Sequence, residues 1–269
     1  MVIGIDKGAS AVKLAAIEKN KVLFLKTLLG DERPAQELYY EFLSENVISE
    51  SRIERIAVTG VGAEGDKLGN GCPAAIHVPE IEATGEGGTA LARQRSAVVV
   101  SIGTGTSIVL VRGGHCRHIG GSGVGSGTLR GLARKMFGLE DVRELFRLAE
   151  RGNRLTVDLT IGDLFSGTDT LPLDLTAANL AKARLGASEA DWAKAIVNMV
   201  LEVAGSHAAL ACNACGLKNV VITGGVSATR IARDVYDNFA RLYHLNYIIP
   251  EYSAYATALG AARKAARQL

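Results

Sequence analysis

One unit of sequence occurs twice in this chain, and each copy reads as an apolar strand, a tight polar turn and a second apolar strand. The first copy runs over residues 1–18 and the second over residues 97–112. Short apolar runs around a turn are typical of a buried hairpin. The copies align without a gap, matching Ile5, Asp6, Gly8, Ser10, Val12 and Leu14 with Ile102, Gly103, Gly105, Ser107, Val109 and Val111. This internal repeat predicts two related lobes.

Both turns share a glycine followed by a serine, Gly8 with Ser10 and Gly105 with Ser107. The apolar positions alone would match in any two buried hairpins, so the matching turn residues are what indicates a shared function. Glycine lets backbone N–H groups approach a ligand closely, and a hydroxyl supplies one more donor to a phosphate oxygen. Asp6 directly follows an apolar strand, where a carboxylate is either a turn residue or faces a ligand. The turns predict a clamp around a polyphosphate.

Charge and hydropathy exclude several classes of partner. The 269 residues carry 30 Lys plus Arg against 28 Asp plus Glu, so the net charge of +2 gives no field that would draw nucleic acid or an acidic membrane. No apolar run approaches the roughly 20 residues that span a bilayer, and the N-terminus lacks the layout of a signal peptide. We expect a cytoplasmic protein with no nucleic-acid or membrane partner.

The remaining elements predict a two-lobed α/β protein. The pattern indicates, in order, a helix over 33–46, a strand over 55–59, a loop over 60–71, a helix in the second half of 80–94, a long core helix over 188–215 capped by Ser188 and Asp191, a strand over 220–223 and a final helix over 253–267. No linker of low complexity divides the chain. The two lobes should therefore share an interface.

Two further glycine-rich segments precede helices. The segment 120–127 leads into a helical pattern over 128–137, and loop glycines at a helix N-terminus favour an anion because free N–H groups and the helix dipole point the same way. Gly224 and Gly225 end a strand before another helix, which places backbone against a phosphate or a flat ligand. Both segments add to the predicted nucleotide site.

The cysteines give a weak signal. Cys212 and Cys215 form a C-x-x-C late in a helix, with Cys72 and Cys116 far away in sequence. Structural zinc sites normally use four ligands in paired clusters, and cytosolic proteins rarely hold disulfides. We expect small core cysteines.

An ordered set of motifs resembles the type II pantothenate kinases. The motifs are Gly4-Ile5-Asp6 with Lys13, residues 78–83 (VPEIEA), 102–107 (IGTGTS), 119–127 (IGGSGVGSG) and 174–179 (DLTAAN), of which the last is the most specific to that family. The family belongs to the superfamily of actin, hexokinase and the heat-shock chaperone ATPases. The resemblance implies phosphorylation of pantothenate, or a pantetheine-like acceptor, at its terminal hydroxyl by ATP and Mg²⁺, in a cytoplasmic homodimer, as the first step toward coenzyme A.

The same resemblance implies roles for particular residues. Glu80 matches the glutamate that takes the proton of the acceptor hydroxyl, although the residues alone leave Glu80 and Glu82 tied, and Asp6 matches the aspartate near the metal and phosphates. Lys13 is either an exposed strand residue or the lysine after the first turn. The predicted nucleotide-binding residues are Asp6, Gly8, Ser10, Lys13, Gly103, Thr104, Gly105, Thr106, Ser107, Gly121, Gly123, Gly125, Gly224 and Gly225.

Two positions depart from the family pattern. The first turn reads Gly8-Ala9-Ser10 where the family usually reads Gly-Gly-Thr, and the added Cβ predicts weaker nucleotide binding. His118, next to Arg117, stands where the family usually has an arginine in the acceptor pocket. Arginine holds a fixed fork of donors and histidine does not, so we expect Arg117 and His118 to face the acceptor and His118 to alter its selection.

The expected fold is the two-lobed actin-like ATPase fold, with duplicated ribonuclease H-like lobes and ATP in the cleft. Residues 1–94 would form the N-terminal lobe, with the helix over 253–269 packed back on it, and 95–252 the C-terminal lobe. Two other functional classes stay open. One is a kinase of another small hydroxyl acceptor such as a sugar, although the Asn-Asp catalytic pair is missing. The other is an ATP-hydrolysing activator or regulator, some of which hold an iron–sulfur cluster at a dimer interface.

Overall fold

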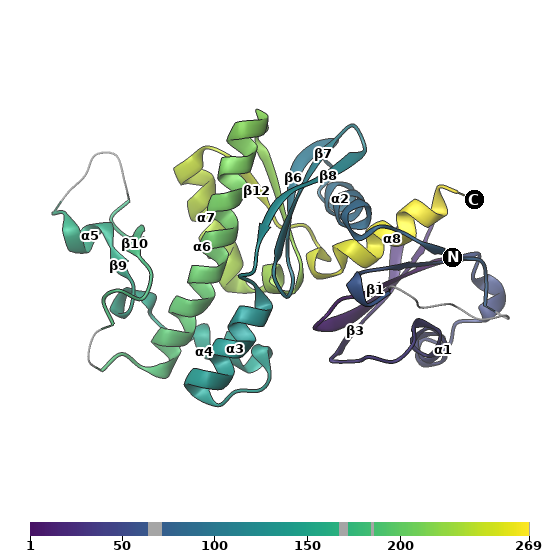
Figure 1. Cartoon of the computed structure of the whole chain (residues 1–269), viewed down its shortest axis with the longest axis horizontal. Helices are drawn as coiled ribbons and strands as arrows, with labels where there is room; N and C mark the ends of the chain where they lie inside the picture. The colour runs from purple at the N-terminus through teal and green to yellow at the C-terminus, as the bar shows by residue number, and fades with distance from the viewer. Residues whose placement is uncertain (64–71, 167–171, 184–185, 269) are drawn as a thin grey trace.

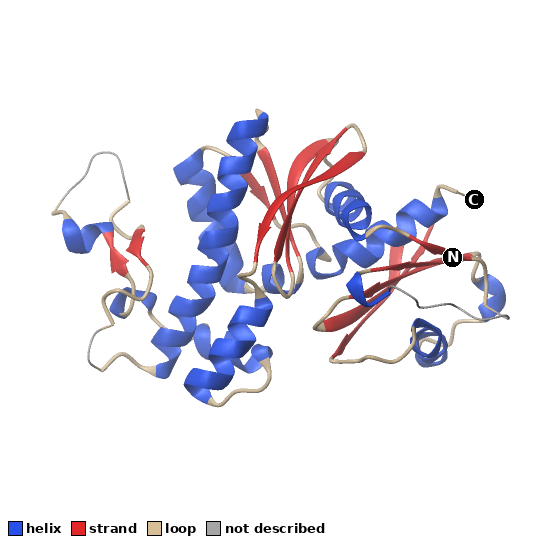
Figure 2. Cartoon of the chain, in the orientation of Figure 1, coloured by secondary structure: helices blue, strands red, loops and turns tan. Residues whose placement is uncertain are grey.

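Two five-stranded sheets form the framework of the chain, with helices between and outside them (Figures 1 and 2). The computed structural model describes residues 1–63, 72–166, 172–183 and 186–268. The first sheet contains β1 (Val2–Lys7), β2 (Ala11–Glu18), β3 (Lys21–Leu29), β4 (Arg55–Thr59) and β5 (Ala75–His77). The second contains β6 (Ser96–Ile102), β7 (Thr106–Arg112), β8 (His115–Ser122), β11 (Asn219–Thr223) and β12 (Asn246–Ile248).

Both sheets have the same strand order and strand directions. The first runs β3-β2-β1-β4-β5 and the second β8-β7-β6-β11-β12. In the first sheet, β3, β2 and β1 are antiparallel to one another in turn, and β4 and β5 run parallel to β1. In the second sheet, β8, β7 and β6 are antiparallel in turn, and β11 and β12 run parallel to β6. The predicted duplication is therefore confirmed. Because β1, β4 and β5 are parallel, as are β6, β11 and β12, each sheet gathers the turns that follow these strands at one edge.

Helices cover both faces of each sheet. On the outer face of the first sheet, α1 (Ala35–Glu45) buries Leu38 and Phe42 against β1 and β4. On the outer face of the second sheet lie α6 (Glu189–Cys215), α7 (Arg230–Tyr243) and α3 (Ser126–Phe137). The inner faces are covered by α8 (Ala256–Ala266) and α2 (Glu80–Leu91), which pack against each other between the sheets (Figure 1).

The two inner helices approach each other through glycines. A Cβ on Gly87 would lie 1.8 Å from the carbonyl oxygen of Ala256, and one on Gly260 would lie 1.9 Å from that of Ala83. No other residue fits there, since real Cβ atoms never come so close to a backbone oxygen. This explains why α2 and α8 are rich in Gly and Ala. The helix α2 spans all of 80–91, so the expectation of a helix only in the second half of 80–94 was too short.

The longest helix, α6, is a core helix of 27 residues. Its start has the predicted capping box, in which the Asp191 N–H donates to Ser188 Oγ and the Ser188 N–H donates to the Asp191 carboxylate. By length and composition it is the one helix among the described residues that could cross a membrane, but 61% of its most apolar window is buried inside the fold. This burial is typical of a core helix.

A smaller region projects from the second lobe beyond α6, at the left of Figure 1. It contains the two-stranded sheet of β9 (Leu159–Thr160) and β10 (Thr176–Ala178) with the short helix α5 (Ile161–Leu164), and α4 (Val142–Ala149) packs on α6 near its base.

Some segments of the structure differ from the predicted ones. Residues 61–63 form a short 3-10 helix, and residues 64–71 of the predicted loop lie outside the described residues. Gly120 and Gly121, expected in a loop, belong to β8. The helix α8 contacts β1, β2 and β4 of the first sheet, while the division of the chain at residue 94 stays a prediction.

Candidate active site

The two glycine turns meet between the sheets. Ser10, in the turn from β1 to β2, and Thr104, in the turn from β6 to β7, have their side-chain oxygens 2.8 Å apart. These residues are 94 positions apart in the chain, so only the folding of the two sheets against one shared layer of helices brings them together. The predicted clamp thus has its two halves in contact.

The second turn is backed by the segment after β8. The N–H groups of Ser126 and Gly127 donate to the carbonyl oxygens of Gly103 and Thr104 over 2.7 and 2.9 Å. A Cβ on Gly125 would lie 2.6 Å from the Thr104 oxygen, so only glycine permits this stacking. The start of α3 therefore lies directly behind the turn, but its first N–H groups are bonded to the turn's carbonyl oxygens, so the free donors expected at this helix N-terminus are not seen there.

The predicted nucleotide glycines fall into two groups. Gly103 and Gly123 have no non-neighbouring atom within 3.8 Å of an added Cβ, so their backbones border open space. By contrast, a Cβ on Gly105 would lie 2.8 Å from the Ser122 carbonyl oxygen, and one on Gly121 2.5 Å from that of Thr106. Packing of the two backbone segments explains the second pair without a ligand.

The hydroxyls of the second turn also differ. Thr106 donates to the Val124 carbonyl oxygen over 2.7 Å and is therefore occupied. The hydroxyl of Ser107 is buried and has no hydrogen-bond partner among the described residues. The Thr104 hydroxyl is bonded to Ser10 of the first turn, so Ser107 holds the one unpartnered hydroxyl of this turn among the described residues.

Three ionisable residues lie together at the edge of the first sheet. Asp6, at the end of β1, pairs in register with Lys13 on β2. Burial raises the pKa of Asp6 to about 6, Lys13 opposes this rise, and the nearby carboxylate of Glu80 adds to it. Asp6 is 8% exposed. A buried carboxylate beside a lysine and a second carboxylate is typical of a functional site.

The structure separates Glu80 from Glu82. Glu80 is the first residue of α2, is exposed, and acts electrostatically on Asp6. Glu82 forms an ion pair with Lys264 of α8 and so is turned toward that helix. Of the two carboxylates, Glu80 is the one beside the turns.

Gly224 and Gly225 follow β11 at the same edge as the second turn. Gly224 has φ +93°, and a Cβ there would lie 2.4 Å from the Ile102 carbonyl oxygen. Gly225 is exposed and faces open space. The strand β11 pairs with β6, so Gly225 borders the second turn from the side away from β7.

Arg117 and His118 do not share a face of their strand. In β8, His118 pairs with Val109 and Arg117 with Leu110. Val109 belongs to the core on the α2 side and Leu110 to the core on the α6 side. Only His118 is therefore on the side of the sheet where α2 begins, and sequence reasoning missed this because β8 was not recognised as a strand.

A magnesium ion fits this site only as a largely hydrated ion. The described residues contain no group of three or more His, Cys, Asp or Glu side chains that could hold a metal. Mg²⁺ usually keeps several waters and binds one or two carboxylates together with substrate phosphates. The Asp6 carboxylate, buried and with no hydrogen bond to it among the described residues, suits that role.

The cysteines are packed in the fold. All four are free thiols, and Cys212 donates to the Asn219 carbonyl oxygen within its own lobe. Burial raises the pKa of Cys212 to about 11. A thiol of this kind is a poor metal ligand.

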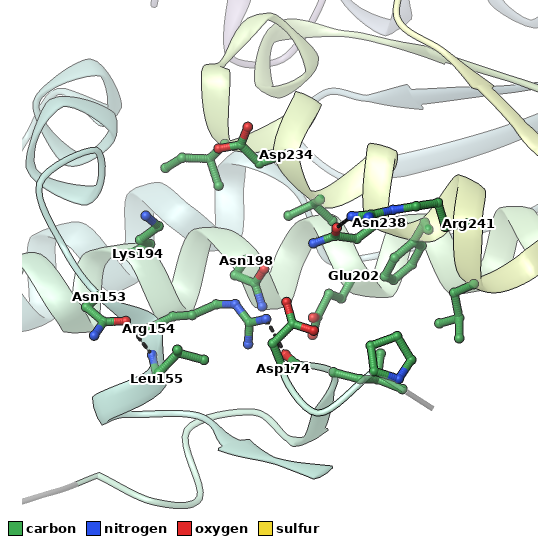
Figure 3. Close-up of a pocket in the computed structure, with 16 residues that line it drawn as sticks. Asn153, Arg154, Leu155, Asp174, Lys194, Asn198, Glu202, Asp234, Asn238 and Arg241 are labelled. Atoms are coloured by element: carbon green, nitrogen blue, oxygen red, sulfur yellow. Dashed lines mark hydrogen bonds between the residues drawn. The ribbon is translucent and has the colours of Figure 1, made fainter. Parts of the chain in front are cut away.

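A separate cavity of about 470 Å³ lies away from the turns, between α6, α7 and the segments 153–155 and 172–175 (Figure 3). At its edge, Glu202 of α6 accepts hydrogen bonds from Thr176 over 2.7 Å and Asn179 over 2.8 Å. Arg154 donates to the Asp174 carbonyl oxygen, a contact that Figure 3 shows. The motif 174–179 is thus hydrogen-bonded to Glu202 of α6. No sequence pattern indicated this partner.

Comparison with known proteins gives a consistent result. A sequence model of the Fumble family matches residues 93–263. A Bacillus cereus protein named type II pantothenate kinase is 30% identical over 191 residues, which cover 68% of this chain and 67% of that protein. One of the same name from Staphylococcus aureus strain USA300 is 26% identical over 273 residues, covering 97% of this chain and 98% of that protein.

Solved structures share the fold. The activator of the 2-hydroxyisocaproyl-CoA dehydratase from Clostridium difficile, solved with bound ADPNP, superposes with a TM-score of 0.66 over 100% of this chain and 97% of that one, at 17% identity. This likeness shows a common fold. The expected two-lobed actin-like ATPase fold is confirmed.

Proposed function

The chain belongs to the Fumble family, and from that premise we propose that it is an ATP-dependent type II pantothenate kinase, which phosphorylates the terminal hydroxyl of pantothenate. The observation that carries the proposal is the contact between Ser10 and Thr104. It joins two glycine turns at a place where Asp6, Lys13 and Glu80 also gather. Phosphoryl transfer needs positioned phosphates, charge neutralisation and a carboxylate for the attacking hydroxyl, and these residues supply each part.

The phosphates of ATP would lie between the two turns. Backbone N–H groups of the two turns that are not bonded within the protein would bind them, and the ammonium of Lys13 would neutralise part of their charge. Asp6 would hold Mg²⁺ through its hydration shell, and the bound ion would neutralise charge on the phosphates. Gly225 would border the adenosine end.

Glu80 would act as the general base. An alcohol is a poor nucleophile at neutral pH, and a carboxylate within hydrogen-bond reach orients the hydroxyl and takes its proton during the attack. Asp6 is unsuited to this role because burial holds it beneath the turns, whereas Glu80 is exposed at the start of α2.

His118 would shape the choice of acceptor. It lies on the face of β8 on which α2 begins, while Arg117 lies on the opposite face. Because a histidine offers fewer donors than the arginine usual at this position, we infer a weaker preference for the pantothenate carboxylate.

A homodimer in the cytoplasm is part of the proposal. Along α6, four apolar side chains spaced by seven, four and seven residues form one stripe, which we call the α6 stripe: Trp192, Met199, Val203 and Leu210. Leu210 is 67% exposed. An apolar stripe of this length on a helix suits a second copy of the chain.

An acceptor panel tests the function. Purified protein is incubated with ATP, Mg²⁺ and one of pantothenate, pantetheine or a set of sugars, and the products are read by mass spectrometry. We expect phosphopantothenate as the main product, and His118→Arg should raise catalytic efficiency for pantothenate relative to pantetheine. A phosphorylated sugar, or ATP hydrolysis without an acceptor in a protein that contains iron, would refute the proposal.

A further inference from the structure

One buried threonine lies beside Asp6 with no partner for its hydroxyl. Thr59 is the last residue of β4 and pairs in register with Asp6 across the parallel strands β1 and β4. Residues in register on parallel neighbours project to the same face of a sheet. The Thr59 and Asp6 side chains therefore lie next to each other at the edge where the turns gather.

The Thr59 hydroxyl is an exception among the buried threonines. Thr59 is 0% exposed, and its Oγ1 has no hydrogen-bond partner among the described residues. Each of the other buried threonines in the described part of the chain has its hydroxyl bonded: Thr84, Thr89, Thr106, Thr160 and Thr223. A buried unpaired hydroxyl is costly, and Thr59 shares this state with Ser107 and Tyr39 in the described part of the chain. Of these three, Thr59 is the one in register with Asp6, which points to a partner that forms with ligand.

The Asp6 carboxylate is the neighbouring acceptor on the adjacent strand. Asp6 accepts no hydrogen bond on its carboxylate among the described residues, although it is largely buried. The turn after Thr59 lies close to it, since a Cβ on Gly60 would come within 2.9 Å of Asp6 Oδ1. Gly60 has φ +97°, which favours glycine and lets the turn fold over Asp6. A donor and an acceptor, neither hydrogen-bonded among the described residues, thus lie side by side on adjacent strands.

Thr59 also lies between the two carboxylates of the site. The strands run in the order β1, β4, β5, and after β5 the chain reaches Glu80. Asp6, Thr59 and Glu80 therefore follow one another along the edge of the sheet. Thr59, in the middle position, can fix the orientation of the Asp6 carboxylate without contacting Glu80, which remains available to the acceptor hydroxyl.

We propose that Thr59 is a positioning residue for Asp6: its hydroxyl donates a hydrogen bond to one carboxylate oxygen of Asp6 when the magnesium–nucleotide complex is bound, which leaves the other oxygen for the hydrated metal and the phosphates. This inference rests on the proposed function. Thr59 does not touch the reacting atoms, and its contribution is to the orientation of Asp6.

Four variants of the full-length protein test it by calorimetric titration with ATP, once with Mg²⁺ and once with a chelator. Thr59→Val and Thr59→Ala lose the hydroxyl, whereas Thr59→Ser keeps the hydroxyl and loses the methyl group. Thr89→Val is the control, because it removes a buried hydroxyl that is bonded within α2. A hydrogen bond to a charged group is worth roughly tenfold or more in affinity. We expect Thr59→Val and Thr59→Ala to weaken MgATP binding about tenfold, with metal-free ATP binding and the KM for pantothenate unchanged.

The pattern among variants decides the outcome. Thr59→Ser should match the wild type, as should Thr89→Val, because both keep the Thr59 hydroxyl. If Thr59→Ser instead falls with Thr59→Ala, the methyl group matters and the proposal is wrong, and this comparison holds even if Thr59→Val fails to fold. Equal losses with and without Mg²⁺ would also overturn it. A wild type that binds no MgATP and phosphorylates no pantothenate would overturn the proposed function itself.

Discussion

At the end of β1, the Asp6 carboxylate is buried beside the carboxylate of Glu80, and burial is the main cause that raises its pKa to about 6. In an unfolded chain its pKa is near 3.8. The folded state therefore binds a proton more tightly than the unfolded state, so the free energy of unfolding falls as pH rises through this window. Above pH 6 the charged, buried carboxylate destabilises the folded state by its full amount. The difference between the folded and unfolded pKa values corresponds to about 3 kcal/mol.

Replacing Asp6 by Asn should therefore stabilise the metal-free protein while it abolishes kinase activity. At pH 7.5, with a chelator present, we expect the free energy of unfolding to rise by up to about 3 kcal/mol. The gain should shrink as pH falls and vanish below about pH 4, where Asp6 is protonated in both states. Denaturant titrations at a series of pH values measure this. A variant less stable than the wild type at pH 7.5 would contradict the account of Asp6.

Glu80 and Glu82 are two carboxylates on one turn of helix with different partners. Glu80→Gln removes the proposed base and preserves volume, so the turnover number should fall roughly 100- to 10,000-fold, with ATP affinity nearly unchanged. Glu82→Gln is the matched control, because Glu82 pairs with Lys264 at the far side of α2 and should keep near-full turnover. Steady-state kinetics checks both. Equal losses in the two variants would mean that Glu80 is not the base.

At the scale of elements, the packing of α2 on α8 joins the two lobes. The helices meet backbone to backbone at Gly87 and Gly260, and ion pairs from Glu82 to Lys264 and from Glu86 to Arg263 flank that contact. Surface ion pairs contribute little individually. The close approach of the two backbones is therefore the feature that we expect to fix the geometry of the interlobe layer.

Adding one methyl group at Gly87 should separate these helices. Its Cβ would lie 1.8 Å from the Ala256 oxygen, so Gly87→Ala should lower the free energy of unfolding by about 1–3 kcal/mol or more through overpacking. Gly131→Ala, in exposed α3 with no atom within 4 Å of the added Cβ, is the matched control and should raise it by about 0.5–1 kcal/mol. Thermal unfolding distinguishes them. A Gly87→Ala protein as stable as the wild type would refute the close contact.

Elements differed in how well the sequence predicted them. The strand β6 contains the apolar run 97–100, and β1 with β2 encloses a glycine turn, so local pattern was sufficient. In contrast, β8 reads His-Cys-Arg-His-Ile-Gly-Gly-Ser and has no apolar period. It is a strand because β7 pairs with it, and Gly121 is needed where its backbone presses on Thr106. That information lies in contacts between segments, which a local pattern does not contain.

The residues of the candidate site also differ in whether a local sequence pattern predicted them. The two turns were predicted because they form a repeated local unit, and Asp6 because a carboxylate directly follows an apolar strand; the structure brings the turns together. The distinction between Glu80 and Glu82 depends on Lys264, 182 residues from Glu82, and the orphan hydroxyl of Thr59 depends on strand register. Neither has a local signal, so each required the assembled fold.

At the scale of the whole molecule, the account predicts a dimer held by the α6 stripe. A double variant, Val203→Glu with Leu210→Glu, places two charges in the stripe and should convert the dimer to a monomer, since burying unpaired charges is costly. Val47→Glu, at an apolar residue that is 92% exposed in the first lobe, is the control and should stay dimeric. Light scattering after size-exclusion chromatography gives the mass. A monomeric wild type, or a double variant that stays dimeric, would contradict this interface.

The central claim is that ATP binds between the two glycine turns, and a reversible crosslink tests it most directly. Ser10 and Thr104 have side-chain oxygens 2.8 Å apart, so cysteines at both positions are close enough to form a disulfide. The oxidised double variant should neither bind ATP in calorimetry nor phosphorylate pantothenate, and reduction should restore both. Each single variant treated with the same oxidant controls for the native cysteines. If the crosslinked protein binds ATP as the reduced form does, the nucleotide does not lie between the turns.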